Sequence, residues 1–372
     1  MDQVQPSGDL ALLDAPRRML LISRTPRGAE PGTPWVRAVA ECVRASAAAG
    51  EALVTGLGRE PYDLALEACR EAGGAAIVVL EAPLGADKHL KDAEAWLPAR
   101  RLIVAPLGAS PKREARALRD RRIADLADRA SVLAVRKGGN MAAVEAELGT
   151  RGVALDRSFE VGEAEARGAP KPALWSPSNL RTFEAWDCLT HYTREPDGVW
   201  PGETYAEYLR WLLHGTPGRS RDAAAALRRI LAQQRIMGSG RLMPAREAMV
   251  SFTARPPQEL PELIRWRKGL RRWTFRPYGV AIRKAALEEL GARPVRYLPH
   301  EALTELPDAE RRFAQLCAPL DADWSVEAEW RLPGDLDLSA LRAADWFALT
   351  PERGEAEALA SEWGGSVASL EA

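Results

Sequence analysis

The sequence predicts an α/β protein, in which a parallel-sheet domain is followed by a second domain of the α+β class. Three observations predict it. The chain has 372 residues, more than a single hydrophobic core usually organises. Residues 18–160 alternate short aliphatic runs with longer helical patterns, which is typical of a parallel sheet covered by helices. Ten of the 12 tryptophans lie at or after Trp175, so the composition changes between the two parts.

The first domain, residues 1–160, is predicted to contain six strands. Between the first two, Val36, Val39 and Val43 recur at helical spacing, which indicates a helix packed against the sheet. Another helix is expected at 141–148, after the fifth strand. The expected strands are 19–23, 52–55, 75–80, 101–105, 131–136 and 153–159.

The second domain is expected at 180–345, after a linker at 161–179 that contains Pro170 and Pro172 and has no apolar period. Residues 346–372 are assigned to a C-terminal tail. In the segment 265–273, tryptophans at helical spacing predict a docked amphipathic helix, and a nucleic-acid surface is the alternative. The expected strands are 187–193, 249–254, 278–282, 295–298 and 324–332, and the expected helices are 204–214 and 221–234.

Three loops of the first domain are candidates for ligand binding. Parallel sheets bind ligands at the carboxyl ends of their strands, where helix N-termini offer free N–H groups to anions. Glycine in such a loop lets the backbone approach a phosphate closely, although it also serves simply to make the turn. The candidates are Ser23 and Arg24 after the first strand, Gly56, Gly58 and Arg59 after the second, and Lys137, Gly138, Gly139 and Asn140 before the helix that carries Glu145.

The first domain resembles a known superfamily in the segments 54–58, 119–126 and 131–139. These look like the core of the DNA-processing protein A and lysine-decarboxylase-like group of Rossmann-like domains, called SLOG. The resemblance implies binding of single-stranded DNA, nucleoside phosphates or nucleotide messengers. The Pro-Gly-Gly-x-Gly-Thr-x-x-Glu run of the hydrolases in this group is missing, and Lys137-Gly138-Gly139-Asn140 stands there instead. Ligand binding is therefore favoured over hydrolysis.

In the second domain, the segment 324–332 carries two carboxylates. As a strand it would place Glu327, Glu329 and Arg331 on one face and apolar residues on the other, because side chains alternate. Arg331 would then hold Glu329 while Glu327 stays free to bind a ligand. The alternative is an exposed face with a surface ion pair.

Two other expected strands carry polar side chains: His191 and Tyr192 on one, Ser251 and Thr253 on the next. A His/Tyr strand, a Ser-x-Thr strand and then Glu327 resemble, in that order, the fold of ADP-ribosyltransferases, which implies NAD as the compound used. A carboxylate suits that chemistry because positive charge develops at the anomeric carbon. The alternatives are a packed histidine and hydroxyls that cap a strand end.

Residues 189–336 also resemble an uncharacterised domain of bacterial abortive-infection proteins, which implies a role in phage defence. The resemblance is based on the segments 276–282, 292–298 and 324–331.

The composition excludes several other classes of protein. The 51 basic and 52 acidic residues nearly cancel, so no global field attracts nucleic acid or a membrane. The longest apolar runs are too short to cross a bilayer. Four widely spaced cysteines and no leader-like segment predict a cytoplasmic protein. His89, His214 and His300 have no partner at metal-ligand spacing, so no metal site is expected.

The favoured hypothesis is a sensor joined to an effector, in which the first domain binds a nucleotide-type ligand and the second acts on NAD in phage defence. The rival is a protein that binds single-stranded DNA without catalysis. A scaffold without catalysis is the third alternative. The sequence leaves open whether the chain is an enzyme and whether it forms a homo-oligomer.

Overall fold

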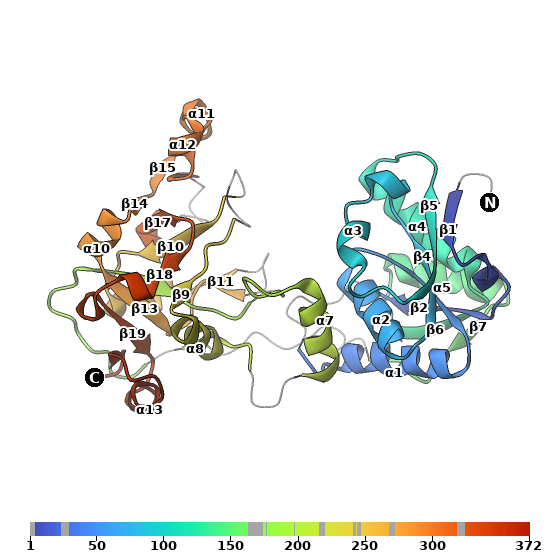
Figure 1. Ribbon diagram of the computed structural model, residues 1–372, viewed down its shortest axis with the longest axis horizontal. Helices are drawn as coiled ribbons and strands as arrows, with labels where there is room; N and C mark the ends of the chain where they lie inside the picture. The colour runs from blue at the N-terminus through green and yellow to red at the C-terminus, as the bar shows by residue number, and fades with distance from the viewer. Residues whose placement is uncertain are drawn as a thin grey trace. The chain divides into compact units, whose positions relative to one another are not determined.

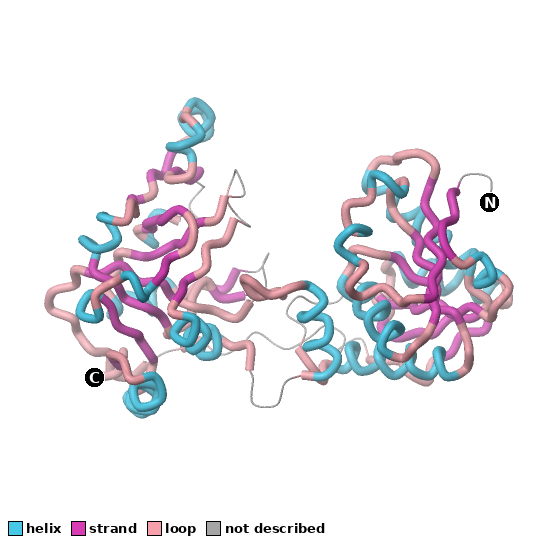
Figure 2. Tube along the Cα trace, viewed as in Figure 1, coloured by secondary structure: helices cyan, strands magenta, loops and turns pink. Residues whose placement is uncertain are grey.

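The computed structural model describes residues 4–23, 30–162, 174–175, 177–196, 198–215, 220–240, 243, 247–267, 272–317 and 324–372. The chain forms two compact units (Figure 1). The first comprises Met1–Pro170 and Glu203–Pro217, and the second comprises Lys171–Gly202 and Gly218–Ala372. In each unit the strands form a central sheet with helices around it (Figure 2).

The first unit contains a seven-stranded sheet in the order β1-β5-β4-β3-β2-β6-β7. All neighbouring strands are parallel except β1, which is antiparallel to β5. The strands are β1 (Val4–Gly8), β2 (Arg17–Ile22), β3 (Ala52–Gly56), β4 (Ala75–Val79), β5 (Arg100–Pro106), β6 (Arg129–Ala134) and β7 (Ala154–Asp156). The helices are α1 (Pro34–Ala48), α2 (Glu60–Glu71), α3 (Leu90–Ala93), α4 (Lys112–Leu126), α5 (Asn140–Thr150) and α7 (Tyr205–His214), with 3-10 turns at Leu10–Leu13 and Leu84–Ala86.

Hydrophobic side chains cover both faces of this sheet, as expected for a parallel sheet between two helical layers. Because side chains alternate along a strand, Leu20 enters the core beneath α1, α2 and α7, while Leu21 enters the core beneath α4 and α5. Trp35 on α1 and Leu148 on α5 are almost fully buried in these two cores. The predicted parallel α/β domain is confirmed.

The second unit is built on another seven-stranded sheet, in the order β14-β17-β10-β8-β13-β19-β20. Its strands are antiparallel except for the parallel pair β19 and β20. One face packs against α8, α10 and α13, and the other against α9 and the β11–β12 hairpin, so the predicted α+β class is confirmed. The sheet strands are β8 (Cys188–Tyr192), β10 (Met249–Thr253), β13 (Gly279–Arg283), β14 (Arg293–Pro294), β17 (Glu329–Pro333), β19 (Trp346–Thr350) and β20 (Val367–Ser369).

The remaining elements of the second unit are short pairs of strands and peripheral helices. The paired strands are β9 (Arg235–Ile236) with β18 (Leu336–Asp337), β11 (Trp266–Arg267) with β12 (Arg272–Trp273), and β15 (Arg296–Leu298) with β16 (Ala314–Leu316). The helices are α8 (Ala223–Gln233), α9 (Leu260–Leu263), α10 (Lys284–Glu289), α11 (His300–Glu305), α12 (Asp308–Arg311) and α13 (Arg353–Trp363), with 3-10 turns at Pro257–Glu259, η5 (Ser325–Glu327), Leu338–Ala340 and Ala343–Asp345.

The strand predicted at 324–332 is wrong in its first half. Ser325–Glu327 forms the 3-10 turn η5, Ala328 has a left-handed φ of 44°, and β17 begins at Glu329. The turn is held by the adjacent strand β10, where the Thr253 hydroxyl donates to the carbonyl of Glu327 at 2.6 Å. Side chains therefore do not alternate along 324–328 as they would in a strand.

Two other predictions in the second half of the chain differ from the structure. Residues 346–372, predicted as a tail, provide β19, α13 and β20, because the buried pair Ala348 and Leu349 takes a place beside β13 in the sheet. The amphipathic helix predicted at 265–273 is a hairpin over its described residues, with Trp266 opposite Trp273. Their rings meet edge to face, with the centroids 5.5 Å apart.

The helix predicted at 204–214 is present as α7, but it packs in the first unit and not in the second. Most of the predicted linker lies outside the described residues. Within the described part of the chain, no helix combines the length and the apolar character needed to span a bilayer.

Candidate ligand-binding rim and candidate active site

The three candidate loops of the first unit lie at one edge of the sheet. They follow β3, β2 and β6, which are adjacent and parallel, so the carboxyl ends of these strands point the same way. The chain adds β3, β4 and β5 on one side of β2 and then returns to add β6 on the other. Such a reversal of strand order is where open α/β sheets bind ligands. The carboxyl ends of β3, β2 and β6, from which these loops start, therefore share one edge, called the rim below.

The loop between β6 and α5 is the open part of the rim. Lys137, Gly138 and Asn140 are exposed, and Gly138 has a φ of +71°, which glycine adopts without strain. Gly139 is the N-cap of α5 and gives it no side-chain acceptor, so the first turn can offer its N–H groups to an anion. The Ser23 hydroxyl accepts the N–H of Arg136 at 2.8 Å and so joins the β2 and β6 ends. Arg24 lies outside the described residues.

The loop after β3 is packed against protein groups. A Cβ on Gly56 would lie 2.9 Å from side-chain atoms of both Arg119 and Tyr62, and one on Gly58 would lie 2.7 Å from the ring of His89. The N–H of Gly58 donates to the carboxylate of Asp63 at 2.9 Å. In this structure, therefore, these two glycines make room for protein side chains, and Asp63 takes the N–H group that a phosphate would use.

A group of arginines lies beside this loop. Arg119 is buried, lies over the ring of Tyr62 at 4.9 Å, and pairs with Glu81 and Asp120. The side chain of Arg59 forms no hydrogen bond or ion pair with the described part of the chain, and its pKa is lowered first by burial and then by two neighbouring arginines. The surroundings of Arg59 therefore favour an anionic partner.

The contacts of Glu145 in this structure argue against a ligand-binding role. Its carboxylate accepts a hydrogen bond from Arg157, which also pairs with Glu160 at 2.9 Å. The carboxylate is therefore already neutralised by a protein group.

In the second unit, the structure fixes Glu329 firmly. Arg331, only 3% exposed, donates to both of its carboxylate oxygens at 2.9 and 3.0 Å. The Ser251 hydroxyl donates to Glu329 at 2.8 Å from the adjacent strand. This is the pairing of Arg331 with Glu329 that the sequence suggests, now on a buried face of the sheet.

Glu327 lies near this pair with a different environment. Burial, and then the charge of Glu329, raise the pKa of Glu327 to about 7. Arg267 approaches its carboxylate at 3.5 Å and lies over the ring of Trp324 at 3.8 Å. The buried hydroxyl of Tyr297 has no hydrogen-bond partner among the described residues, and burial raises its pKa to about 12. Glu329 is thus held by hydrogen bonds from Arg331 and Ser251, whereas Glu327 is buried and approached by Arg267.

His191 does not share this face of the sheet. Thr190 lies opposite Thr253, so the neighbouring residue on β8, His191, points to the other side. There its ring packs edge to face with Phe252, and Nδ1 lies 2.8 Å from the carbonyl of Ser251. Burial lowers the pKa of His191, so the ring is neutral at pH 7.

Tyr192 lies on the same face as Thr253 but is only 6% exposed, within an aromatic cluster that includes Phe275. The structure therefore brings together Ser251, Thr253, Glu327 and Glu329, and leaves His191 outside. Arg267, Tyr297 and Trp324 also neighbour this group, and the sequence pattern does not predict them there. The tryptophan-rich basic run at 265–273 is the signal for Arg267, but its spacing favours a helix.

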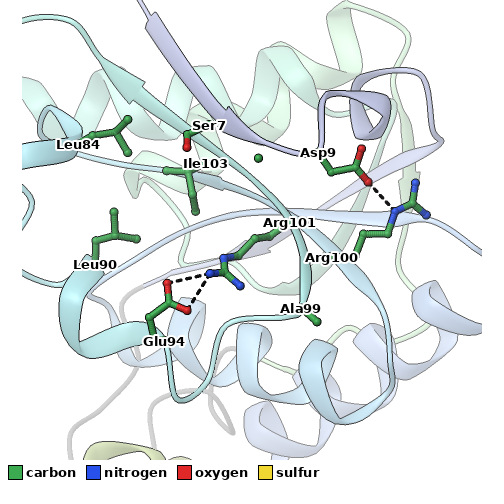
Figure 3. A pocket seen from close by; sticks show the side chains of 10 residues that line it. Ser7, Asp9, Leu84, Leu90, Glu94, Ala99, Arg100, Arg101 and Ile103 are labelled. Carbon is green, nitrogen blue, oxygen red and sulfur yellow. Dashed lines mark hydrogen bonds and ion pairs between the residues drawn. The ribbon is translucent and has the colours of Figure 1, made fainter.

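A hollow of about 700 Å³ lies beside β5 (Figure 3). Its charged side chains are already paired: Arg101 with Glu94 at 2.7 Å, and Arg100 with Asp9 at 2.8 Å. It therefore offers a ligand little charge to bind. Among the described residues, no three His, Cys, Asp or Glu side chains are grouped so that they could hold a metal ion.

Comparison with family models and with curated proteins finds no match. Among solved structures, DNA processing protein A from Streptococcus pneumoniae is 19% identical, over 41% of this chain and 53% of that one, with a TM-score of 0.35. DNA processing protein A from Helicobacter pylori, described by its single-stranded DNA binding mode, is 17% identical over 41% and 69%, with a TM-score of 0.34. This chain thus spans about half of the first protein's length. Both belong to the group that the first domain resembles, but likeness at this level assigns no function here.

Proposed function

We propose that the first unit binds a nucleotide-type ligand through its phosphates at the rim, and that this binding controls a second unit that cleaves a glycosidic bond in a nucleotide, with NAD as the candidate substrate. The observation that carries the proposal is the rim itself: a helix N-terminus without a side-chain cap, and Arg59, whose side chain has no ion-pair partner among the described residues, at adjacent carboxyl strand ends.

Phosphate is the group that these features suit best. The N–H groups at the start of α5 and the positive end of its dipole favour an anion. The exposed Lys137 adds a flexible cation, and Arg59 adds a planar donor that can bind two oxygens at once. Glu81, an acidic residue beside these groups, is already paired with Arg119.

For the second unit, the two glutamates support glycosidic chemistry. Glu329 is held by Arg331 and Ser251, so its charge is fixed in place. Glu327, with a pKa of about 7, can exist in either form at neutral pH. A carboxyl group with a raised pKa beside a second carboxyl group that is held by an arginine suits chemistry in which positive charge develops at an anomeric carbon.

The binding half is tested by calorimetry on the full chain with ADP and NAD. Arg59→Ala should weaken binding by roughly tenfold, the loss of one charged contact worth about 1.5 kcal/mol. The matched control is Arg121→Ala, an exposed arginine on α4. Equal affinity in the two variants would refute the rim as the binding site.

The catalytic half is tested by incubating the full chain with NAD and measuring released nicotinamide. Glu327→Gln should abolish release, whereas Glu362→Gln, an exposed glutamate on α13, should leave it intact. If the native chain releases no nicotinamide, with or without ADP, NAD chemistry is excluded. The cellular role proposed is phage defence, and loss of protection in cells that express Glu327→Gln would support it.

A second candidate function is supported by the exposed Arg136 and Lys137 at the rim, since cations on an open edge also suit the backbone of single-stranded DNA. In that case a labelled oligonucleotide would bind the full chain with a steep salt dependence, and ADP would not compete. Competition by ADP would favour the nucleotide site instead.

A further inference from the structure

Helix α7 connects the two units in an unusual way. It belongs to the first unit, while the residues on both sides of it, Lys171–Gly202 and Gly218–Ala372, belong to the second. Thr204 and Glu207 form a capping box that fixes its first turn. A displacement of α7 would therefore be transmitted along the chain to the second unit on both sides.

The first turn of α7 bonds to the loop after β3 through one side chain. Asp63, only 2% exposed, accepts the N–H of Gly58 at 2.9 Å with one oxygen and the hydroxyl of Tyr205 at 3.1 Å with the other. Gly58 belongs to the rim. Asp63 is thus an internal carboxylate that occupies a rim N–H group and is held there by α7.

The rest of α7 is bound to α2 without contact to that loop. Tyr208 donates to Glu60 at 2.8 Å, Arg210 to Glu67 at 3.0 Å, and His214 lies 2.7 Å from Glu71. Leu209 and Leu212 are fully buried in the core. These contacts keep α7 docked even when the bond between Tyr205 and Asp63 breaks, so that bond can change alone.

We infer that α7 is an autoinhibitory latch: Asp63, held by Tyr205, competes with the ligand's phosphate for the N–H of Gly58, and ligand binding releases the first turn of α7. The inference rests on the proposed ligand binding at the rim. A phosphate oxygen at Gly58 accepts that N–H in place of Asp63, so the carboxyl group of Asp63 is displaced and Tyr205 loses its acceptor. The second unit senses the ligand through the segment that continues from α7.

Because thermodynamic linkage is reciprocal, a change that weakens the attachment of the first turn of α7 must also raise the affinity for the ligand. Removal of the Tyr205 hydroxyl leaves Asp63 less firmly placed and should tighten ligand binding on the order of fivefold, the worth of one hydrogen bond. Removal of the Tyr208 hydroxyl breaks a bond of the same kind that does not reach Gly58. Tyr208→Phe is therefore the matched control for Tyr205→Phe.

The first experiment needs no ligand. Hydrogen exchange of the full chain is followed at the amide of Gly58, resolved from Glu60 with overlapping peptides, and in peptides that cover 204–214. Tyr205→Phe should speed exchange at both places, and Tyr208→Phe only in 204–214, because its partner Glu60 does not bond to Gly58. If Tyr205→Phe leaves the Gly58 amide unchanged, α7 and the loop are not coupled and the inference fails.

The second experiment uses inorganic pyrophosphate as the probe, with binding measured by calorimetry. The expected result is faster exchange of 204–214 in the native chain on binding, with tighter binding to Tyr205→Phe and unchanged binding to Tyr208→Phe. Binding without any change in α7, and equal in all three chains, would overturn the latch and leave the proposed function standing. Absence of binding would overturn the proposed function, and the latch as a response to ligand with it.

Discussion

The buried pair of Glu329 and Arg331 allows a quantitative test of the second unit. Arg331→Met removes the two bonds to Glu329 and the bonds that the guanidinium donates to the carbonyls of Arg312 and Ala314 and to Gln315, at 3.0, 3.2 and 2.6 Å. The side chain of Glu329 is 13% exposed and, among the described residues, keeps the hydrogen bond from the Ser251 hydroxyl. Breaking a buried pair by removing one partner costs about 3–5 kcal/mol, because the remaining charge is left without compensation.

We therefore expect Arg331→Met to lower the free energy of unfolding of the second unit by about 3–5 kcal/mol. The assay is urea denaturation of the full chain, followed by tryptophan fluorescence, since nine of the 12 tryptophans lie in the second unit. The double variant Arg331→Met with Glu329→Gln removes the stranded charge and should recover part of the loss. A loss below about 1 kcal/mol, the worth of an exposed pair, or a double variant as unstable as the single one, would refute the assignment of a buried pair.

Three further predictions follow from single residues. Glu327, with a pKa near 7, must be ionised to stabilise positive charge, so nicotinamide release should rise between about pH 6 and 8. Glu329→Gln removes a neighbouring negative charge and should move the midpoint to lower pH. A rate of release that does not change with pH would contradict this. Burial raises the pKa of Asp63 from 3.8 to about 7, so the folded state holds a proton that the unfolded state releases. Stability of the first unit should then fall by up to ~4 kcal/mol as pH rises from about 4 to 7, and Asp63→Asn should abolish this slope in urea titrations at each pH. Gly58→Ala should destabilise the first unit by about 1–3 kcal/mol, because φ is +77° and the new Cβ meets His89; an unchanged thermal midpoint would show that the loop adapts.

The sequence predicts the first unit well because its elements form locally. Each of the strands β2 to β6 is followed by a helix before the next strand, so periodicity along the chain and the rules of parallel sheets are enough to place the ends of β2, β3 and β6 at one rim. What the sequence does not provide is which groups already occupy the rim. The hydrogen bond from the N–H of Gly58 to Asp63 depends on the three-dimensional path of the turn between them. The spacing of residues in the sequence does not determine that path.

In the second unit the strands pair with partners far away in the sequence, so the sequence predicts the faces of these strands less well. β8 lies between β10 and β13, which are more than 50 residues away in the sequence, so the face that His191 occupies depends on partners that no local pattern names. The Ser-x-Thr and Glu segments do meet, because β10 and β17 are neighbours. Glu327 departs from the strand because its backbone is bonded to Thr253, a contact between segments 74 residues apart.

The acidic face of α2 explains why α7 belongs to the first unit. Glu60, Asp63 and Glu67 are all largely buried on this short helix, and Glu67 is 0% exposed. Buried carboxylates are costly unless they are hydrogen-bonded. Helix α7 supplies a donor to each: Tyr208 to Glu60, Tyr205 to Asp63 and Arg210 to Glu67. Without α7, α2 would hold poorly compensated acids beside the loop that is proposed to bind phosphate. The same acids that make α7 necessary for the fold thus oppose an anion at the rim, which is why a ligand strong enough to bind there would act on α7.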